Sequence, residues 1–146
     1  MVVIMDESEL QYLLKAVENE DNKSLDGQTL ASIKTTVNNM LQQLPFMRGT
    51  VLKNTVKKLD EYRFVEDVED LRYGSYVRWF NLTTDDPRLT NGGIVCDMTV
   101  GETGVVVKCK NRMGRIFSFN LSECLVFQKL SDQEKIILFA VEYLSK

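Results

Sequence analysis

The chain has no histidine among its 146 residues. Histidine is the side chain that most often acts as a general base near neutral pH, and it is also the commonest metal ligand. Its absence excludes Ser-His-Asp and Cys-His mechanisms. The chain also lacks glycine-rich phosphate loops of the GxxxxGKS/T or GxGxxG type. We therefore expect a protein that is not an enzyme and that uses no cofactor.

Cysteine is scarce and lacks metal-binding spacing. Cys96, Cys109 and Cys124 lie 13 and 15 residues apart, with no Cys-x-x-Cys pair. This spacing excludes a zinc ribbon and a thioredoxin-like site. An odd count without a disulfide framework is typical of a reducing compartment, so the sequence predicts three reduced, buried thiols in an intracellular protein.

Long apolar runs are also missing. The apolar segment 1–5 is too short for a signal-peptide core or a membrane span, and Asp6 and Glu7 follow it directly. We interpret it as a strand or an anchoring arm. No membrane partner is expected.

Charge is unevenly distributed along the chain. Its 18 basic and 21 acidic side chains give a net charge of −3, which argues against a general nucleic-acid binder. Residues 1–70 hold 8 basic and 13 acidic side chains, whereas residues 71–130 hold 8 and 5. A weakly basic half therefore follows an acidic half.

Residues 1–70 have the apolar periodicity of three helices. The first runs from residue 6 to about 18, and Ser8 with Gln11 has the form of a capping box. The second is capped by Asp26 and ended by Pro45. The third runs from about residue 50 to 62, with Tyr62 on its apolar face.

A fourth helix is predicted after residue 130. Ser131 and Glu134 have the spacing of a capping box, and apolar residues follow at helical spacing.

Between these helical regions the apolar period changes to that of strands. The segment 75–82 places Val77 and Trp79 on one face and Tyr76 and Phe80 on the other, so we expect it to be buried on both faces. A loop of about ten residues follows it. Alternation in the next two strands predicts these inward side chains: Ile94, Cys96, Met98, Val100, Val105, Val107 and Cys109.

About five short strands joined by tight turns are typical of a small SH3-like or Tudor-like barrel. The sequence thus predicts an α+β fold, with N-terminal helices followed by a small antiparallel SH3-like β-barrel and a C-terminal helix. The parts are residues 1–70, 71–130 and 131–146. Because so small a barrel has little core, we expect the helices to complete it as one composite domain.

Three segments together resemble a known pattern: Leu71–Phe80, Gly92–Val95 and Cys124–Leu130. They look like small proteins of large eukaryotic DNA viruses, in which a G-x-Y-V/I-R-W/Y strand and a GG strand precede a hydrophobic-F-x-K-L strand. The resemblance covers about residues 59–130. It implies an SH3-like barrel, a viral origin and a non-enzymatic role in the host cytoplasm or the virion. No functional site is attached to these motifs that could be carried over to this chain.

Two groups of side chains are candidate binding residues. The basic hairpin residues Lys108, Lys110, Arg112 and Arg115 have the geometry for phosphate contacts, although they also suit a solvated hairpin that resists edge-to-edge association. The alternation predicts no aromatic side chain on the outward face beside them. The second group resembles a methyl-lysine cage in composition, but its alternation favours core packing or a partner surface: Tyr73, Tyr76, Trp79 and Phe80.

The carboxylates Asp85, Asp86 and Asp97 are weaker candidates. The first two precede Pro87 and are typical of a turn, while Asp97 has an outward strand position. We therefore expect no metal site.

Two functional hypotheses remain. The first is a non-catalytic protein-interaction or structural module, part of a viral assembly, whose partner is another protein or a second copy of the chain. The alternative is a nucleic-acid-binding small barrel that uses the basic hairpin.

Overall fold

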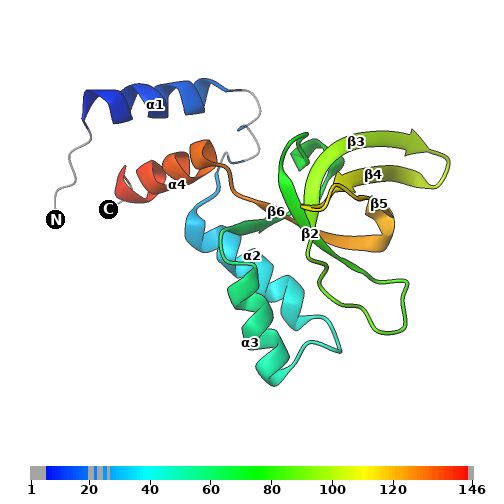
Figure 1. Cartoon of the computed structure of the whole chain (residues 1–146). Coiled ribbons are helices and arrows are strands. Elements are labelled where there is room, and N and C mark those ends of the chain that lie inside the picture. Colours follow the sequence, from blue (N-terminus) through cyan, green and yellow to red (C-terminus); the bar gives the residue numbers. More distant parts are fainter. Residues whose placement is uncertain (1–5, 20–21, 23–24, 26, 145–146) are drawn as a thin grey trace. The chain divides into compact units, whose positions relative to one another are not determined.

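The computed structural model describes residues 6–19, 22, 25 and 27–144. These contain four α-helices and a six-stranded antiparallel sheet, which confirms the α+β class (Figure 1). The chain divides into two compact units. We call Met1–Ile33 with Leu130–Lys146 the helical unit, and Lys34–Lys129 the sheet unit.

In the helical unit, α1 (Glu7–Glu18) packs on α4 (Asp132–Leu144). The predicted cap of α1 is wrong, because Asp6 and not Ser8 accepts a backbone hydrogen bond, from the Glu9 amide at 2.8 Å. The predicted capping box of α4 is confirmed. The Glu134 amide donates to the Ser131 hydroxyl at 3.1 Å, and the Glu134 carboxylate accepts from the Ser131 amide at 3.0 Å.

Helix α2 (Leu30–Gln42) crosses the boundary between the units, and α3 (Gly49–Lys58) lies within the sheet unit. Thr29 and Ser32 exchange side-chain and backbone hydrogen bonds at the start of α2, while the predicted cap Asp26 lies outside the described residues. The third helix is shorter than predicted. Glu61 adopts a positive φ of 65°, which breaks the helical path, and Tyr62 then begins a strand.

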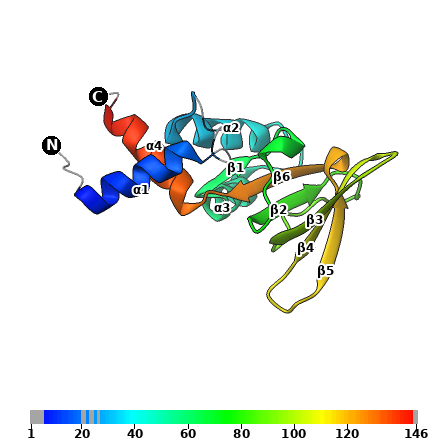
Figure 2. The same cartoon turned by 90° about the horizontal axis from the view of Figure 1, so that it is seen from above.

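The sheet has the strand order β1-β6-β2-β3-β4-β5. Its strands are β1 (Tyr62–Phe64), β2 (Tyr76–Asn81), β3 (Gly93–Gly101), β4 (Gly104–Lys110), β5 (Ile116–Asn120) and β6 (Cys124–Lys129). Short 3-10 helices, Val68–Asp70 and Leu121–Glu123, precede β2 and β6. Strands β1 and β5 are the two edges, so the sheet curls without closing into the predicted barrel (Figure 2).

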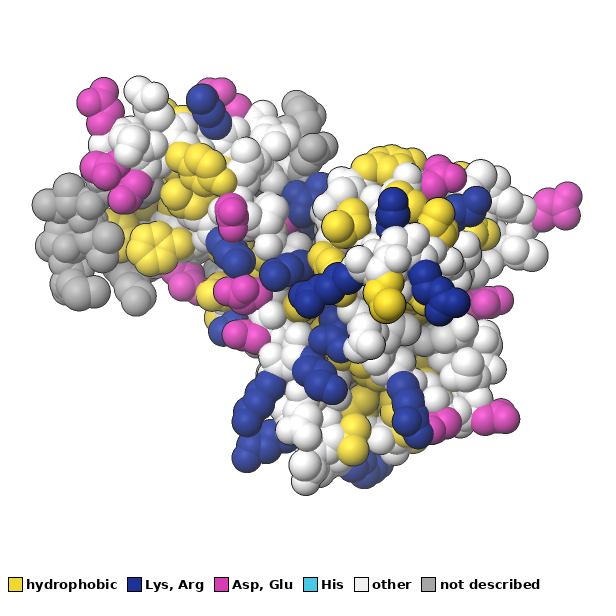
Figure 3. Space-filling model, viewed as in Figure 1, with side chains coloured by type: hydrophobic (Ala, Val, Ile, Leu, Met, Phe, Trp, Pro, Cys, Tyr) yellow, Lys and Arg dark blue, Asp and Glu magenta, His cyan; other side chains and the backbone are white. Residues whose placement is uncertain are grey.

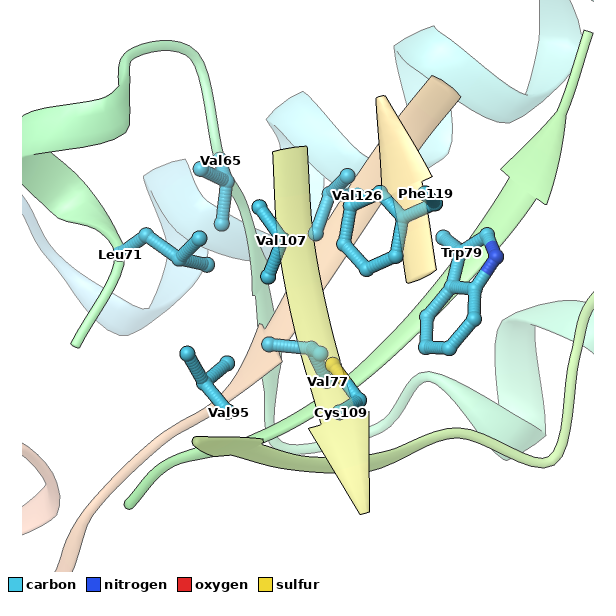
Figure 4. Packing of buried hydrophobic residues seen from close by; sticks show 9 residues of the cluster. All are labelled: Val65, Leu71, Val77, Trp79, Val95, Val107, Cys109, Phe119 and Val126. Atoms are coloured by element: carbon cyan, nitrogen blue, oxygen red, sulfur yellow. The ribbon is translucent and has the colours of Figure 1, made fainter. Parts of the chain in front are cut away.

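The inner face of the curled sheet holds one of the two apolar clusters of the sheet unit. Its buried side chains converge from several strands, as Figure 4 shows: Val65, Leu71, Val77, Trp79, Val95, Val107, Cys109, Phe119 and Val126. The predicted inward alternation of β4 is confirmed, since Val107 and Cys109 are fully buried while Lys108 and Lys110 are exposed.

The outer face of β1, β6 and β2 holds a second cluster. Phe80 and Phe127 are fully buried there, in a cluster with Leu41 of α2 and with Leu59, which follows the end of α3. Because Val77 and Trp79 face the inner cluster and Phe80 the outer one, β2 is buried on both faces, as predicted.

The predicted alternation of β3 is wrong at Ile94 and Cys96, which are exposed, and correct at Met98, which packs against the inner cluster. Val95 is buried, whereas Ile94 and Val100 are 48% and 83% exposed. A β-bulge between Val95 and Asp97 inserts Cys96 as an extra residue, and so it reverses the alternation partway along the strand. As a result the Cys96 thiol is exposed, not buried, while Cys109 is buried, Cys124 is half-buried and all three thiols are unpaired.

Candidate functional site

The helices cover only part of the outer face of the sheet. Phe80 and Phe127 lie under α2 and α3, and the opposite end of β2 and β6 carries Tyr76, Arg78 and Lys129. In the antiparallel pair β2–β6, Arg78 lies opposite Phe127 and Val77 lies opposite Gln128. The same register brings Tyr76 next to Lys129, and Arg78 lies on the same face of β2 as Tyr76. The uncovered end of the sheet is therefore polar and basic.

A pocket of about 500 Å³ opens at this end of the sheet. Strands β1, β2 and β6, the loop before β3 and the β4–β5 turn all contribute to it. Its lining residues are Tyr62, Tyr76, Arg78, Asn91, Gly92, Asn111, Arg112, Met113 and Lys129. Three are cationic, two are tyrosines and none is a carboxylate. This volume lies in the range of small-molecule and cofactor sites.

The loop before β3, which forms part of the pocket, is held against β2 by three contacts. The Tyr76 hydroxyl donates to the Asn91 carbonyl, and the Arg78 Nε donates to the Thr90 carbonyl at 2.8 Å. Gly92 has a φ of +86°, and a Cβ there would lie 2.2 Å from the Val77 carbonyl oxygen. Only glycine fits so close an approach of the two backbones.

The tight turn between β4 and β5 also lines the pocket. The Asn111 side-chain oxygen accepts hydrogen bonds from the amides of Met113 and Arg115, both at 3.0 Å. This local bonding is the usual way in which asparagine stabilises a turn. It holds Arg112 and Met113 at the edge of the pocket, where the Met113 side chain is 86% exposed.

Tyr62 and Arg78 interact electrostatically within the pocket. Partial burial raises the pKa of Tyr62 above its usual value of 10.0, and the positive charge of Arg78 only partly opposes this shift. The Tyr62 phenol is therefore neutral at physiological pH. It offers the pocket an aromatic ring and a hydroxyl donor.

The structure places one of the predicted basic residues in the pocket and the others on the surface beside it. Arg112 lines the pocket, whereas Lys108 and Lys110 are exposed on the outward face of β4, and Arg115 is exposed just after the turn. Figure 3 shows many of the drawn Lys and Arg side chains over the sheet unit.

The predicted aromatic group is also divided. Tyr76 lines the pocket, Trp79 and Phe80 are buried in different clusters, and Tyr73 is 60% exposed. The expectation that no aromatic side chain stands near the basic hairpin is wrong, because Tyr62 and Tyr76 share the pocket with Arg112.

Three charged or aromatic residues of the pocket were not among the candidates: Tyr62, Arg78 and Lys129. The alternation of β2 already placed Arg78 on the same face as Tyr76, so the sequence pattern could have identified Arg78 as a pocket residue. No sequence pattern could have identified Tyr62, because the helical period of the preceding segment continues up to it.

The carboxylates form no metal site in the described part of the chain. Asp86 pairs with Arg88, with a carboxylate oxygen 2.9 Å from a guanidinium nitrogen, and the Asp97 carboxylate accepts from the Met98 amide at 3.0 Å. Between residues 6 and 144, where described, no three of His, Cys, Asp and Glu are grouped so as to hold a metal ion.

No described helix has the length and apolar character that crossing a membrane requires. No protein-family model, curated protein or solved structure matches the chain.

Proposed function

We propose that the sheet unit is a non-catalytic module that binds single-stranded nucleic acid, with one nucleotide in the pocket. The observation that carries this proposal is the lining of the pocket, where Arg78, Arg112 and Lys129 stand with two tyrosines and no carboxylate. Cations contact phosphates, and aromatic rings stack on unpaired bases at about 1–3 kcal/mol per base. An anion that carries a flat ring meets both requirements.

The net negative charge of the chain does not oppose this function. The sheet unit holds 14 basic and 11 acidic residues, a net charge of +3, and the acidic excess belongs to the helical unit. Phosphate contacts depend on charges within about a Debye length of the site, roughly 8–10 Å at physiological salt. The local charge around the pocket therefore matters more than the total.

The connectivity supports an SH3-like identity for this module. Strands β2 to β6 pair in the order β6-β2-β3-β4-β5, a long loop separates β2 from β3, and a 3-10 turn precedes β6. A small SH3-like barrel has the same sequence of elements. A role in a virion or an infected cell is supported by the resemblance to proteins of large DNA viruses.

Binding without catalysis agrees with the residue types at the site. The chain has no histidine, and the pocket lining has no carboxylate, cysteine or serine. General acid–base catalysis most often uses histidine or a carboxylate, and covalent catalysis often uses serine or cysteine.

A titration tests the proposal directly. A fluorescent ten-nucleotide single strand and a duplex of equal length are titrated with the protein at 50 and 200 mM salt. We expect the single strand to bind more tightly. Three phosphate contacts give a salt slope of about −2, which weakens binding by about tenfold to twentyfold between the two salt concentrations.

Matched variants locate the site. Arg112→Ala and Lys129→Ala each remove a pocket cation and should weaken binding by about threefold to tenfold. Arg88→Ala and Lys53→Ala remove exposed cations that do not line the pocket, so they should have little effect. Absence of binding at 50 mM salt, or equal losses in all four variants, would refute the proposal.

A second candidate function is protein interaction through the helical unit. Helix α1 exposes Leu10, Leu14 and Val17 at helical spacing, and α4 exposes Phe139 and Leu144. Exposed apolar side chains at such spacing are typical of helix-binding surfaces. Light scattering combined with cross-linking tests this function. A monomer that retrieves no protein partner would argue against it.

A further inference from the structure

The outward surface of the sheet continues beyond the pocket across β3, β4 and β5. Strand register places one row of residues side by side, because Tyr76 lies opposite Ile94, Ile94 opposite Lys110, and Lys110 opposite Ile116. Directly opposite residues in antiparallel strands share a face of the sheet. The row therefore begins at the pocket residue Tyr76 and ends at the edge strand.

Every residue of this row beyond Tyr76 is open to solvent. Ile94 and Ile116 are 48% and 61% exposed, and Lys110 is exposed between them. Apolar side chains beside a lysine suit a ligand that alternates flat apolar groups with negative charges. We name this surface, formed by Ile94, Lys110 and Ile116, the outer row.

The charge beside the outer row has the same sign as the charge in the pocket. Lys108 lies on the same face of β4 as Lys110, and its cross-strand neighbour Asp97 is the one acid paired with β4 in the described sheet. Arg112 follows Lys110 after one residue and lines the pocket. The basic surface is thus continuous from the pocket to the outer row.

We propose that a nucleic-acid strand held in the pocket continues along the outer row, so that the site spans several nucleotides. This inference rests on the proposed function. Strands in a sheet lie about 4.8 Å apart, so the distance from β2 to β5 is about 14 Å. One stacked strand advances about 3.4 Å per nucleotide, so about four nucleotides cover that distance.

The outer row favours an unpaired strand over a duplex. Bases in a duplex are stacked inside the helix, so Ile94 and Ile116 would face phosphates and remain without apolar contacts. In a single strand the base faces are free to pack on these isoleucines while a phosphate meets Lys110. An acidic peptide has charges for the lysines but no flat rings for the isoleucines.

A length series separates the pocket from the outer row. Oligothymidylates of two, four, six and ten nucleotides are titrated against the protein at 50 mM salt. We expect affinity to rise with length up to about six nucleotides and then to level off. A deca-glutamate peptide serves as the competing anion and should bind at least about tenfold more weakly than the ten-nucleotide strand.

Variants of the outer row should then act on long ligands alone. Lys110→Ala and Ile116→Ala should weaken the binding of the ten-nucleotide strand by about threefold to tenfold and leave the binding of the dinucleotide unchanged. Lys53→Ala and Val100→Ala are matched controls, because both residues are exposed and lie outside the pocket and the row. Circular dichroism verifies that each variant is folded.

The outcomes distinguish the two proposals. If no oligonucleotide of any length binds, the proposed function fails, and this inference fails with it. If all lengths bind equally and Lys110→Ala changes nothing, the pocket function stands and the outer row is refuted. If deca-glutamate binds as tightly as the ten-nucleotide strand, the partner is an acidic protein segment and not nucleic acid.

Discussion

Trp79 on β2 stacks on Phe119 on β5, with ring centroids 4.3 Å apart and an interplanar angle of 28°. Strands β3 and β4 separate these two strands in the order of the sheet. The stacking therefore shows how strongly the sheet curls, because side chains from β2 and β5 meet across its inner face without a strand-to-strand hydrogen bond. This contact joins the two sides of the inner cluster, as Figure 4 shows.

Removing the Phe119 ring should destabilise the sheet unit strongly. Phe119 is 5% exposed, and a buried Phe→Ala change typically costs about 3–5 kcal/mol. Urea unfolding followed by the fluorescence of Trp79, the single tryptophan of the chain, measures the loss. Phe117→Ala on the same strand is the control. Because Phe117 is 45% exposed, this substitution should lower the free energy of unfolding by less than about 1 kcal/mol. Equal costs for the two variants would contradict the described core.

Two glycines with nearly equal backbone angles should respond differently to substitution. Gly74 and Gly92 have φ values of +82° and +86°, but a Cβ on Gly74 meets nothing within 4 Å. Gly74→Ala should therefore cost about 1 kcal/mol from backbone strain alone. Gly92→Ala should cost about 1–3 kcal/mol more, because the new Cβ clashes with β2.

Urea unfolding compares the two glycine variants, and oligonucleotide titration shows whether Gly92→Ala also disturbs the pocket wall. If both variants lose the same stability, the close approach of Gly92 to Val77 does not exist in solution.

The three thiols should react at very different rates in the folded protein. Burial raises the pKa of Cys109 to about 12 and that of Cys124 to about 11, so both are almost entirely protonated at neutral pH. Cys96 is exposed at the bulge of β3. N-ethylmaleimide should modify Cys96 alone in the native state and all three thiols in denaturant, which mass spectrometry can count.

Cys96→Ser is the control for this labelling and should remove the native-state modification. Fast native labelling of Cys109 would mean that the inner face of the sheet is open to solvent.

The start of α1 should depend on pH through Asp6. Hydrogen bonds from the Glu9 amide and the Ser8 hydroxyl lower the pKa of Asp6 below its usual value of 3.8. The folded pKa is thus lower than the unfolded one, so the cap stabilises α1 above the unfolded pKa and is lost as pH falls through the folded pKa. NMR titration of the Asp6 carboxyl and the Glu9 amide measures this shift.

Asp6→Asn is the matched variant for the cap. Asparagine also caps helices well but does not titrate, so the part of the pH dependence of α1 that comes from the cap should be absent in this variant. A pKa of Asp6 at or above 3.8 would show that the carboxylate does not cap the helix in solution.

Features that depend on near neighbours in the chain were determined by the sequence itself. The capping box of Ser131 and Glu134 and the alternation of β4 join residues a few positions apart, so spacing alone predicts them. Burial of β2 on both faces could also be predicted, because Val77 and Phe80 are apolar on opposite faces. The chemistry that the chain lacks, histidine above all, could be read directly.

Features that depend on pairing between distant segments were decided only by the tertiary structure. The bulge at Cys96 reverses the faces of β3, and it arises from the register with β4, which the local pattern does not contain. Tyr62 becomes a strand residue because it pairs with Lys129, the last residue of the sheet unit in the sequence. The pocket likewise forms only after the strands have paired, because its residues Tyr62, Arg78 and Arg112 lie far apart in the sequence.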